Sequence, residues 1–210
     1  MNTYHKKGIG QFLTNSSESK QILNELNHYY QIMEEKERKW MKKIIAGIKT
    51  TGHELKFCQE KGYYNSKEQL ISINKDSYCF FHEIGHYIDA QIGFYKFGKT
   101  AIKIFIKEFN RKNIDIETYL VSNHNYPYKK LSGLIFDSLC IYYKINPWEY
   151  GYRGHKPEYY SSDIEKGAGT ELFAEFFAVK FMHSNEMFFL KQEFPKTYYY
   201  LNSVIKNLIN

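Results

Sequence analysis

The sequence has too few cysteines and no long apolar run, which excludes several common protein classes. Its three cysteines, Cys58, Cys79 and Cys140, are odd in number and lack C-x-x-C spacing, so they form neither a disulfide framework nor a thiolate zinc site. We expect them to be reduced and mostly buried. No stretch approaches the roughly 20 apolar residues of a membrane span, and the N-terminus lacks the apolar run of a secretion signal.

The positive charge of the chain is not gathered into blocks. Its 29 basic and 23 acidic residues give a net charge of +6. This even spread argues against a dedicated nucleic-acid-binding arm, and we expect neither nucleic acid nor membrane as a partner. If the numbering starts at the native Met1, the sequence predicts a cytoplasmic protein, whereas a trimmed signal would indicate a secreted one.

Length and apolar spacing predict a mainly helical α+β fold with a small β-sheet. The 210 residues suit a single domain, 1–210. Short runs at 53–57, 62–64 and 70–73 favour two or three strands with a hairpin. Apolar residues at helical spacing predict helices over 16–33, 40–48, 77–92, 100–110 and 131–143.

The stretch FFHEIGHYID, Phe80–Asp89, contains the motif H-E-x-x-H. On a helix, His82 and His86 lie one turn apart on one face, so both imidazoles can reach a single Zn²⁺. Glu83 projects close to the metal without binding it and can act as general base toward a metal-bound water. Gly85 costs about 1 kcal/mol inside a helix, which indicates that another segment packs closely against this turn. The short motif also occurs by chance in proteins that bind no metal.

A third metal ligand has to come from elsewhere in the chain. The longer motif H-E-x-x-H-x-x-G-x-x-H requires Gly at position 89 and His at position 92, where this chain has Asp89 and Ile92. Asp89 could instead accept a hydrogen bond from the second ring nitrogen of a histidine ligand and orient it.

Two glutamates of a second apolar helix are the candidates for the third ligand. This helix is predicted from an N-cap at Thr170 to about Met182, with Glu171 and Glu175 one turn apart. Buried carboxylates need a cation or hydrogen-bond donors. Glu171 can bind the metal while Glu175 orients a histidine. Two alternatives stay open: Glu175 is the ligand and Glu171 the orienting residue, or one of the two glutamates lies at the solvent edge of the helix.

These segments together resemble a known family. FFHEIGHYID, followed by ELFAEFFA, FMHS and FPKTYYYLNSVIKNLIN, is similar to the catalytic domain of anthrax lethal factor and its relatives, which include the Pro-Pro endopeptidases. The resemblance covers about residues 53–95 and 165–210. It implies a zincin-like domain that binds Zn²⁺ through His82, His86 and Glu171, uses Glu83 as general base and takes a protein or peptide substrate.

The chain departs from that family in two places. The family has a Tyr that stabilises the oxyanion seven residues before the ligand Glu, and Ile164 stands at that position here. Glu171 also follows His86 by 85 positions, a long gap. Residues about 111–150 are therefore predicted to be a helical insertion.

The substitute for the missing Tyr is expected in the aromatic, Gly- and Pro-rich loop before Ile164. Tyr160 is the predicted oxyanion donor because it lies near the ligand helix in sequence. Any one of the candidate side chains of this loop could instead serve only to pack against its neighbours. The alternatives with suitable chemistry are Tyr152, His155 and Tyr159.

The sequence thus predicts a zinc-dependent endopeptidase, either a toxin or an enzyme that cleaves one regulatory protein such as a mobile-element repressor. The alternative is a structural or interaction protein of a phage or mobile element that retains a zincin-like zinc site. Glu83 argues against this alternative, because a purely structural zinc site needs no base.

Overall fold

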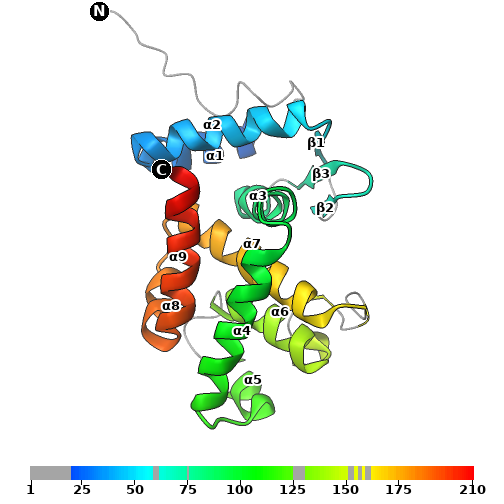
Figure 1. Ribbon diagram of the computed structural model, residues 1–210, viewed down its shortest axis with the longest axis vertical. Coiled ribbons are helices and arrows are strands. Elements are labelled where there is room, and N and C mark those ends of the chain that lie inside the picture. Colours follow the sequence, from blue (N-terminus) through cyan, green and yellow to red (C-terminus); the bar gives the residue numbers. More distant parts are fainter. Residues whose placement is uncertain are drawn as a thin grey trace, which may run out of the picture. The chain divides into compact units, whose positions relative to one another are not determined.

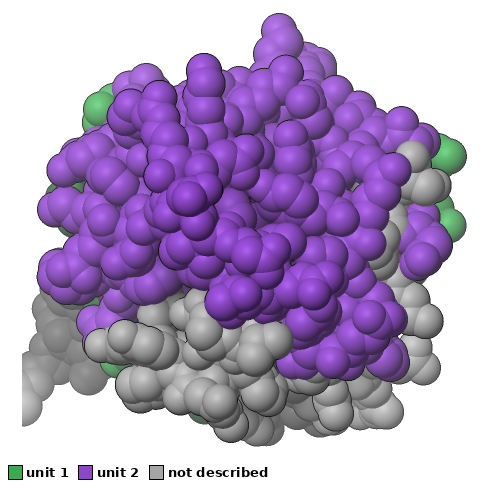
Figure 2. Space-filling view, turned by 90° about the horizontal axis from the view of Figure 1, so that it is seen from below, with its two compact units in different colours: residues 1–84, 209–210 green, residues 85–208 purple. Residues whose placement is uncertain are grey.

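The computed structural model describes residues 20–58, 62–74, 76–124, 131–150, 154–155, 158 and 162–210. The chain divides into two compact units, residues 1–84 with 209–210 and residues 85–208, which Figure 2 colours separately. The division falls inside helix α3 (Ser77–Gln91), so the two ends of this helix belong to different units. In the described part, helices predominate and a three-stranded sheet accompanies them, as the α+β prediction requires.

The described part of unit 1 contains two complete helices and the small sheet, which Figure 1 shows in blue and cyan, together with the first part of α3. The helices are α1 (Lys20–Ile32) and α2 (Glu35–Thr50). The strands are β1 (Glu54–Phe57), β2 (Tyr63–Asn65) and β3 (Leu70–Ile73). The central strand is β3, which pairs with β1 in parallel and with β2 as an antiparallel hairpin. The predicted hairpin is confirmed.

The central strand β3 also connects the sheet to the core of unit 1. Its last three residues are buried, and Ile71 and Ile73 are fully enclosed. Phe80 and Phe81 at the start of α3 are fully buried too, and the ring of Phe81 meets that of Tyr29 edge-on at 6.0 Å. Burial of this first part of α3 fixes the helix at the end that carries the H-E-x-x-H motif.

The central helix of unit 2 is α7 (Ile164–Phe181). It is buried almost without interruption from Gly167 to Phe181, as expected for a helix that is apolar on all sides. Two helices pack against it, α4 (Lys96–Arg111) and α6 (Leu131–Tyr143). The remaining elements are α5 (Ile116–His124), the 3₁₀ helix η3 (Pro147–Tyr150), α8 (Glu186–Glu193) and α9 (Pro195–Ile209).

Helix α7 begins earlier than the sequence predicts, so the N-cap expected at Thr170 is wrong. The N-cap is Asp163, whose side chain accepts a hydrogen bond from the Lys166 backbone N–H. Gly169, in this added first part of the helix, serves packing. A Cβ there would lie 2.4 Å from the carbonyl oxygen of Gly98 on α4. The two helices therefore touch through their backbones.

A buried carboxylate on α4 has a structural role that differs from those at the candidate site. Glu108 accepts hydrogen bonds from the backbone N–H groups of Lys196 and Thr197, both at 2.8 Å, and from the Thr197 hydroxyl at 2.7 Å. These donors belong to the first turn of α9, where backbone N–H groups lack partners within the helix. Glu108 thus holds the start of α9 against α4.

All three cysteines are free, as predicted. Cys79 and Cys140 are buried, and Cys58 is half-buried. Burial raises the pKa of Cys79 and of Cys140 to about 12, so both thiols stay protonated, unlike the thiolates that bind metals. No helix among the described residues combines the length and apolar character that a membrane crossing requires.

Candidate metal centre

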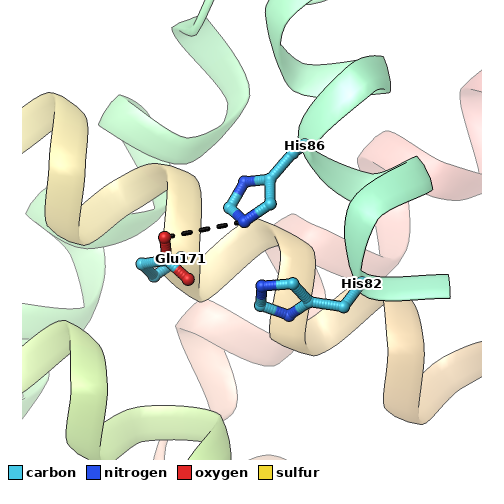
Figure 3. A group of neighbouring side chains, drawn as sticks. All are labelled: His82, His86 and Glu171. Carbon is cyan, nitrogen blue, oxygen red and sulfur yellow. Dashed lines mark ion pairs between the residues drawn. The ribbon is translucent and has the colours of Figure 1, made fainter. Parts of the chain in front are cut away.

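Helix α3 carries both histidines of the motif, as the spacing predicts. The ring of His82 stacks on that of Tyr78, one turn earlier, with centroids 6.1 Å apart and planes 25° from parallel. His86 follows one turn later and is buried. Figure 3 shows the two imidazoles on the same side of the helix. The helix therefore presents both rings toward one point.

A close approach of two helices brings Glu171 to His86. A Cβ at Gly85 would lie 2.8 Å from the Cα of Ala174 on α7, so only glycine fits there. The segment predicted to pack against Gly85 is thus α7. Glu171 lies one turn before this contact, and its Oε1 is 3.5 Å from Nε2 of His86 (Figure 3).

The side chains of His82, His86 and Glu171 have the arrangement of a metal site. Each offers one ligand atom, these atoms lie within 4.8 Å of one another, and all three residues are buried. Two ligands 2.0–2.1 Å from a tetrahedral zinc ion are roughly 3.3 Å apart. The 3.5 Å between His86 and Glu171 matches that spacing and exceeds the usual length of an N–H···O hydrogen bond. Two imidazole nitrogens and one carboxylate oxygen are a ligand set that suits Zn²⁺.

The predicted base, Glu83, is buried and lies close to the backbone before β2. A Cβ at Gly62 would lie 3.3 Å from Oε1 of Glu83 and only 2.0 Å from Sγ of Cys79. Because Gly62 has no side chain, the space beside it is occupied by the side chains of Glu83 and Cys79. The sequence places Gly62 in a predicted strand and gives no sign of this role, because only the fold brings Gly62 to α3.

The structure distinguishes the two glutamates of α7. Among the described residues, the groups able to hold a metal ion include Glu171 but not Glu175. Glu175 is buried one turn further along α7. Burial, and then the negative charge of Glu186, raise the pKa of Glu175 from its ordinary 4.5 to about 8. Its assignment as the residue that orients a histidine stays a prediction.

The raised pKa of Glu175 predicts a pH dependence of stability. Between pH 4.5 and about 8 the folded state holds a proton that the unfolded state has lost, so the free energy of unfolding falls as pH rises. We expect a loss of roughly 4 kcal/mol between pH 5 and pH 9. Urea unfolding of the metal-free protein measures it. Glu175→Gln should remove most of this dependence, and an unchanged pH profile of the variant would contradict the prediction.

Asp89, a candidate for orienting a histidine, is used to join three helices. Its carboxylate accepts hydrogen bonds from the backbone N–H of Gly98 at 3.1 Å and from the hydroxyl of Thr170 at 3.3 Å. Asp89 is fully buried, and burial raises the pKa of its carboxyl group, an effect that these hydrogen bonds and His86 oppose. Asp89 thereby ties the end of α3 to α4 and α7.

Of the side chains predicted to replace the missing Tyr, the structure places His155 at the candidate centre. Its Nδ1 is 3.8 Å from Oε1 of Glu171 and 2.6 Å from Oδ2 of Asp137 on α6. Ile164 is the first residue of α7. The predicted donor Tyr160 lies outside the described residues, as do Tyr152 and Tyr159.

Asp137 is a residue at this centre that the sequence motifs do not predict. Together with His155 and Glu171 it forms a second group whose ligand atoms lie within 4.8 Å of one another. A signal for it was available, since Asp137 is the only charged residue in the apolar segment LSGLIFDSLCIYY that forms α6. A single carboxylate in such a helix needs a partner. Whether the segment around it is an insertion stays a prediction.

The chain shows no significant match to any protein family, curated protein or solved structure. The candidate centre is therefore defined by its own geometry and by the chemistry of its residues.

Proposed function

We propose that this protein is a zinc-dependent endopeptidase. The observation that carries the proposal is the buried group of His82, His86 and Glu171, in which the H-E-x-x-H helix meets a carboxylate from a second helix at metal-ligand spacing. A purely structural zinc site normally has four protein ligands, whereas three leave a position for substrate. The resemblance to lethal factor-like peptidases agrees with this proposal and remains a resemblance.

In peptide hydrolysis each of these residues would have a separate role. His82, His86 and Glu171 hold the metal, and a bound zinc ion supplies Lewis acidity toward water and the substrate carbonyl. Glu83 takes a proton from the attacking water, whose oxygen bonds to the carbonyl carbon. As the C–N bond breaks, Glu83 delivers that proton to the leaving amine, so atoms and charge balance.

Metal analysis and a cleavage assay test this proposal together. We expect about one zinc per chain after dialysis, and hydrolysis of a mixed library of fluorogenic peptides that a chelator stops and added zinc restores. A protein that binds no zinc even after reconstitution would refute the metal site. A protein with one zinc and no cleavage of any peptide or denatured protein would instead favour the structural or interaction role.

A further inference from the structure

The pair of Asp137 and His155 is a built feature of unit 2 that the proposed function does not yet use. We propose that His155, oriented by Asp137, donates a hydrogen bond to the carbonyl oxygen that becomes negatively charged during peptide hydrolysis. This inference rests on the proposed function, since it assigns the oxyanion donor of the same site. It gives His155 the role that the sequence predicts for Tyr160.

Asp137 fixes both the backbone and the ring of His155. One carboxylate oxygen accepts the His155 backbone N–H at 2.8 Å, and the other is 2.6 Å from the ring Nδ1. A carboxylate only accepts hydrogen bonds, so Nδ1 is the donor. Gly154, the residue before His155, is also held, because the indole N–H of Trp148 donates to its carbonyl oxygen at 3.0 Å. A ring fixed in this way has little rotational freedom to lose when it meets a ligand.

The position of this ring suits a group that acts on substrate. Its Nδ1 is 3.8 Å from Oε1 of Glu171, so the ring lies beside the metal-ligand group. The side chain of Asp137 is 11% exposed, whereas that of His155 is 38% exposed. The oriented ring is thus the solvent-accessible member of the pair. In the imidazolium form of the ring, Nδ1–H is directed to Asp137, and the second nitrogen, Nε2, carries the N–H that can be donated to a substrate.

Distances favour this role over a second cation site made by the same residues. Two ligands of one zinc ion are roughly 3.3 Å apart, and the 3.5 Å between His86 and Glu171 agrees with that value. The 2.6 Å between His155 and Asp137 is too short for co-ligands and corresponds to a charge-assisted hydrogen bond. A second metal would have to break this contact before it could bind.

The first experiment compares wild type with His155→Ala, Asp137→Asn and the control His28→Ala, an exposed histidine of α1. Removal of an oxyanion donor is expected to lower kcat on the fluorogenic peptides by about 10²–10³-fold, with KM and zinc content little changed. Asp137→Asn keeps the size of the side chain but cannot accept Nδ1–H with its amide nitrogen, so we expect a smaller loss of about 10–100-fold.

The second experiment needs no cleavage. Phenylphosphonate presents tetrahedral anionic oxygens, and its binding to the cobalt-substituted protein can be followed by visible absorption. We expect His155→Ala to weaken this binding by about 10–100-fold, the effect of a lost hydrogen bond to a charged group. Acetohydroxamate, which only needs the metal, should bind both proteins equally.

The outcomes separate this inference from the proposed function. If wild type cleaves no peptide, the proposed function fails, while the phosphonate comparison still decides the role of His155. Equal phosphonate affinity of wild type and His155→Ala, or no binding by either, overturns the inference. So does the loss of one of two zinc ions in His155→Ala, which would make the group a second metal site.

Discussion

Replacement of Glu83 by Gln is expected to abolish peptide hydrolysis while zinc stays bound and the fold is kept. Gln has the size of Glu but cannot accept and deliver the proton that hydrolysis moves, and general acid–base catalysis contributes about 10²–10⁴-fold to the rate. Glu83 is buried next to Gly62, so an isosteric substitution is needed to avoid a clash there. The measurements are kcat on fluorogenic peptides, zinc content and melting temperature.

The matched control for this prediction is Glu68→Gln, at an exposed glutamate in the turn before β3. It makes the same chemical change at the surface and should leave kcat unaltered. A Glu83→Gln protein that cleaves as fast as wild type would remove Glu83 from the mechanism. Loss of zinc in that variant would indicate instead that Glu83 helps to hold the metal.

Replacement of Glu171 by Ala is expected to remove zinc almost completely, from about one per chain to near zero. The carboxylate is fully buried beside His86, and its loss leaves only two protein ligands. Glu175→Ala should retain zinc with an affinity reduced by about 10–100-fold, as for a residue that acts through a ligand. Competition with a fluorescent zinc chelator measures both affinities.

Glu165→Ala controls for any general effect on α7. This glutamate lies in the first turn of the same helix, in a surface ion pair with Lys103, where a substitution changes little. The variant with the weaker zinc affinity, Glu171→Ala or Glu175→Ala, identifies the glutamate that is the third ligand. If Glu175→Ala loses the metal and Glu171→Ala keeps it, the ligand is Glu175 and the spacing between Glu171 and His86 has another cause.

The features that the sequence predicts well depend on neighbours within one helix or one turn. The His82–His86 face follows from helical spacing alone, and the hairpin from short β-rich runs with a turn between them. Gly85 predicted a close neighbour correctly but not which one, because the identity of α7 depends on tertiary packing.

The features that the sequence does not predict depend on contacts between distant segments. Asp137 and His155 are in separate segments, and nothing local relates the acid of an apolar helix to a histidine in a loop. The start of α7 was misplaced for a similar reason. Gly169 weakens a helix locally, yet the backbone contact with Gly98 requires a glycine there.

The contact between Gly85 and Ala174 has a consequence for ion selectivity. Because Gly85 brings no side chain to this contact, the distance between the main chains of α3 and α7 is short and limits how far apart His86 and Glu171 can be. A larger distance between the ligand atoms of His86 and Glu171 would require a whole helix to move, and a change of side-chain rotamer would not be enough. Calcium forms longer bonds of about 2.3–2.6 Å to six or more oxygens. We therefore expect the site to exclude calcium and to favour small ions that accept nitrogen ligands.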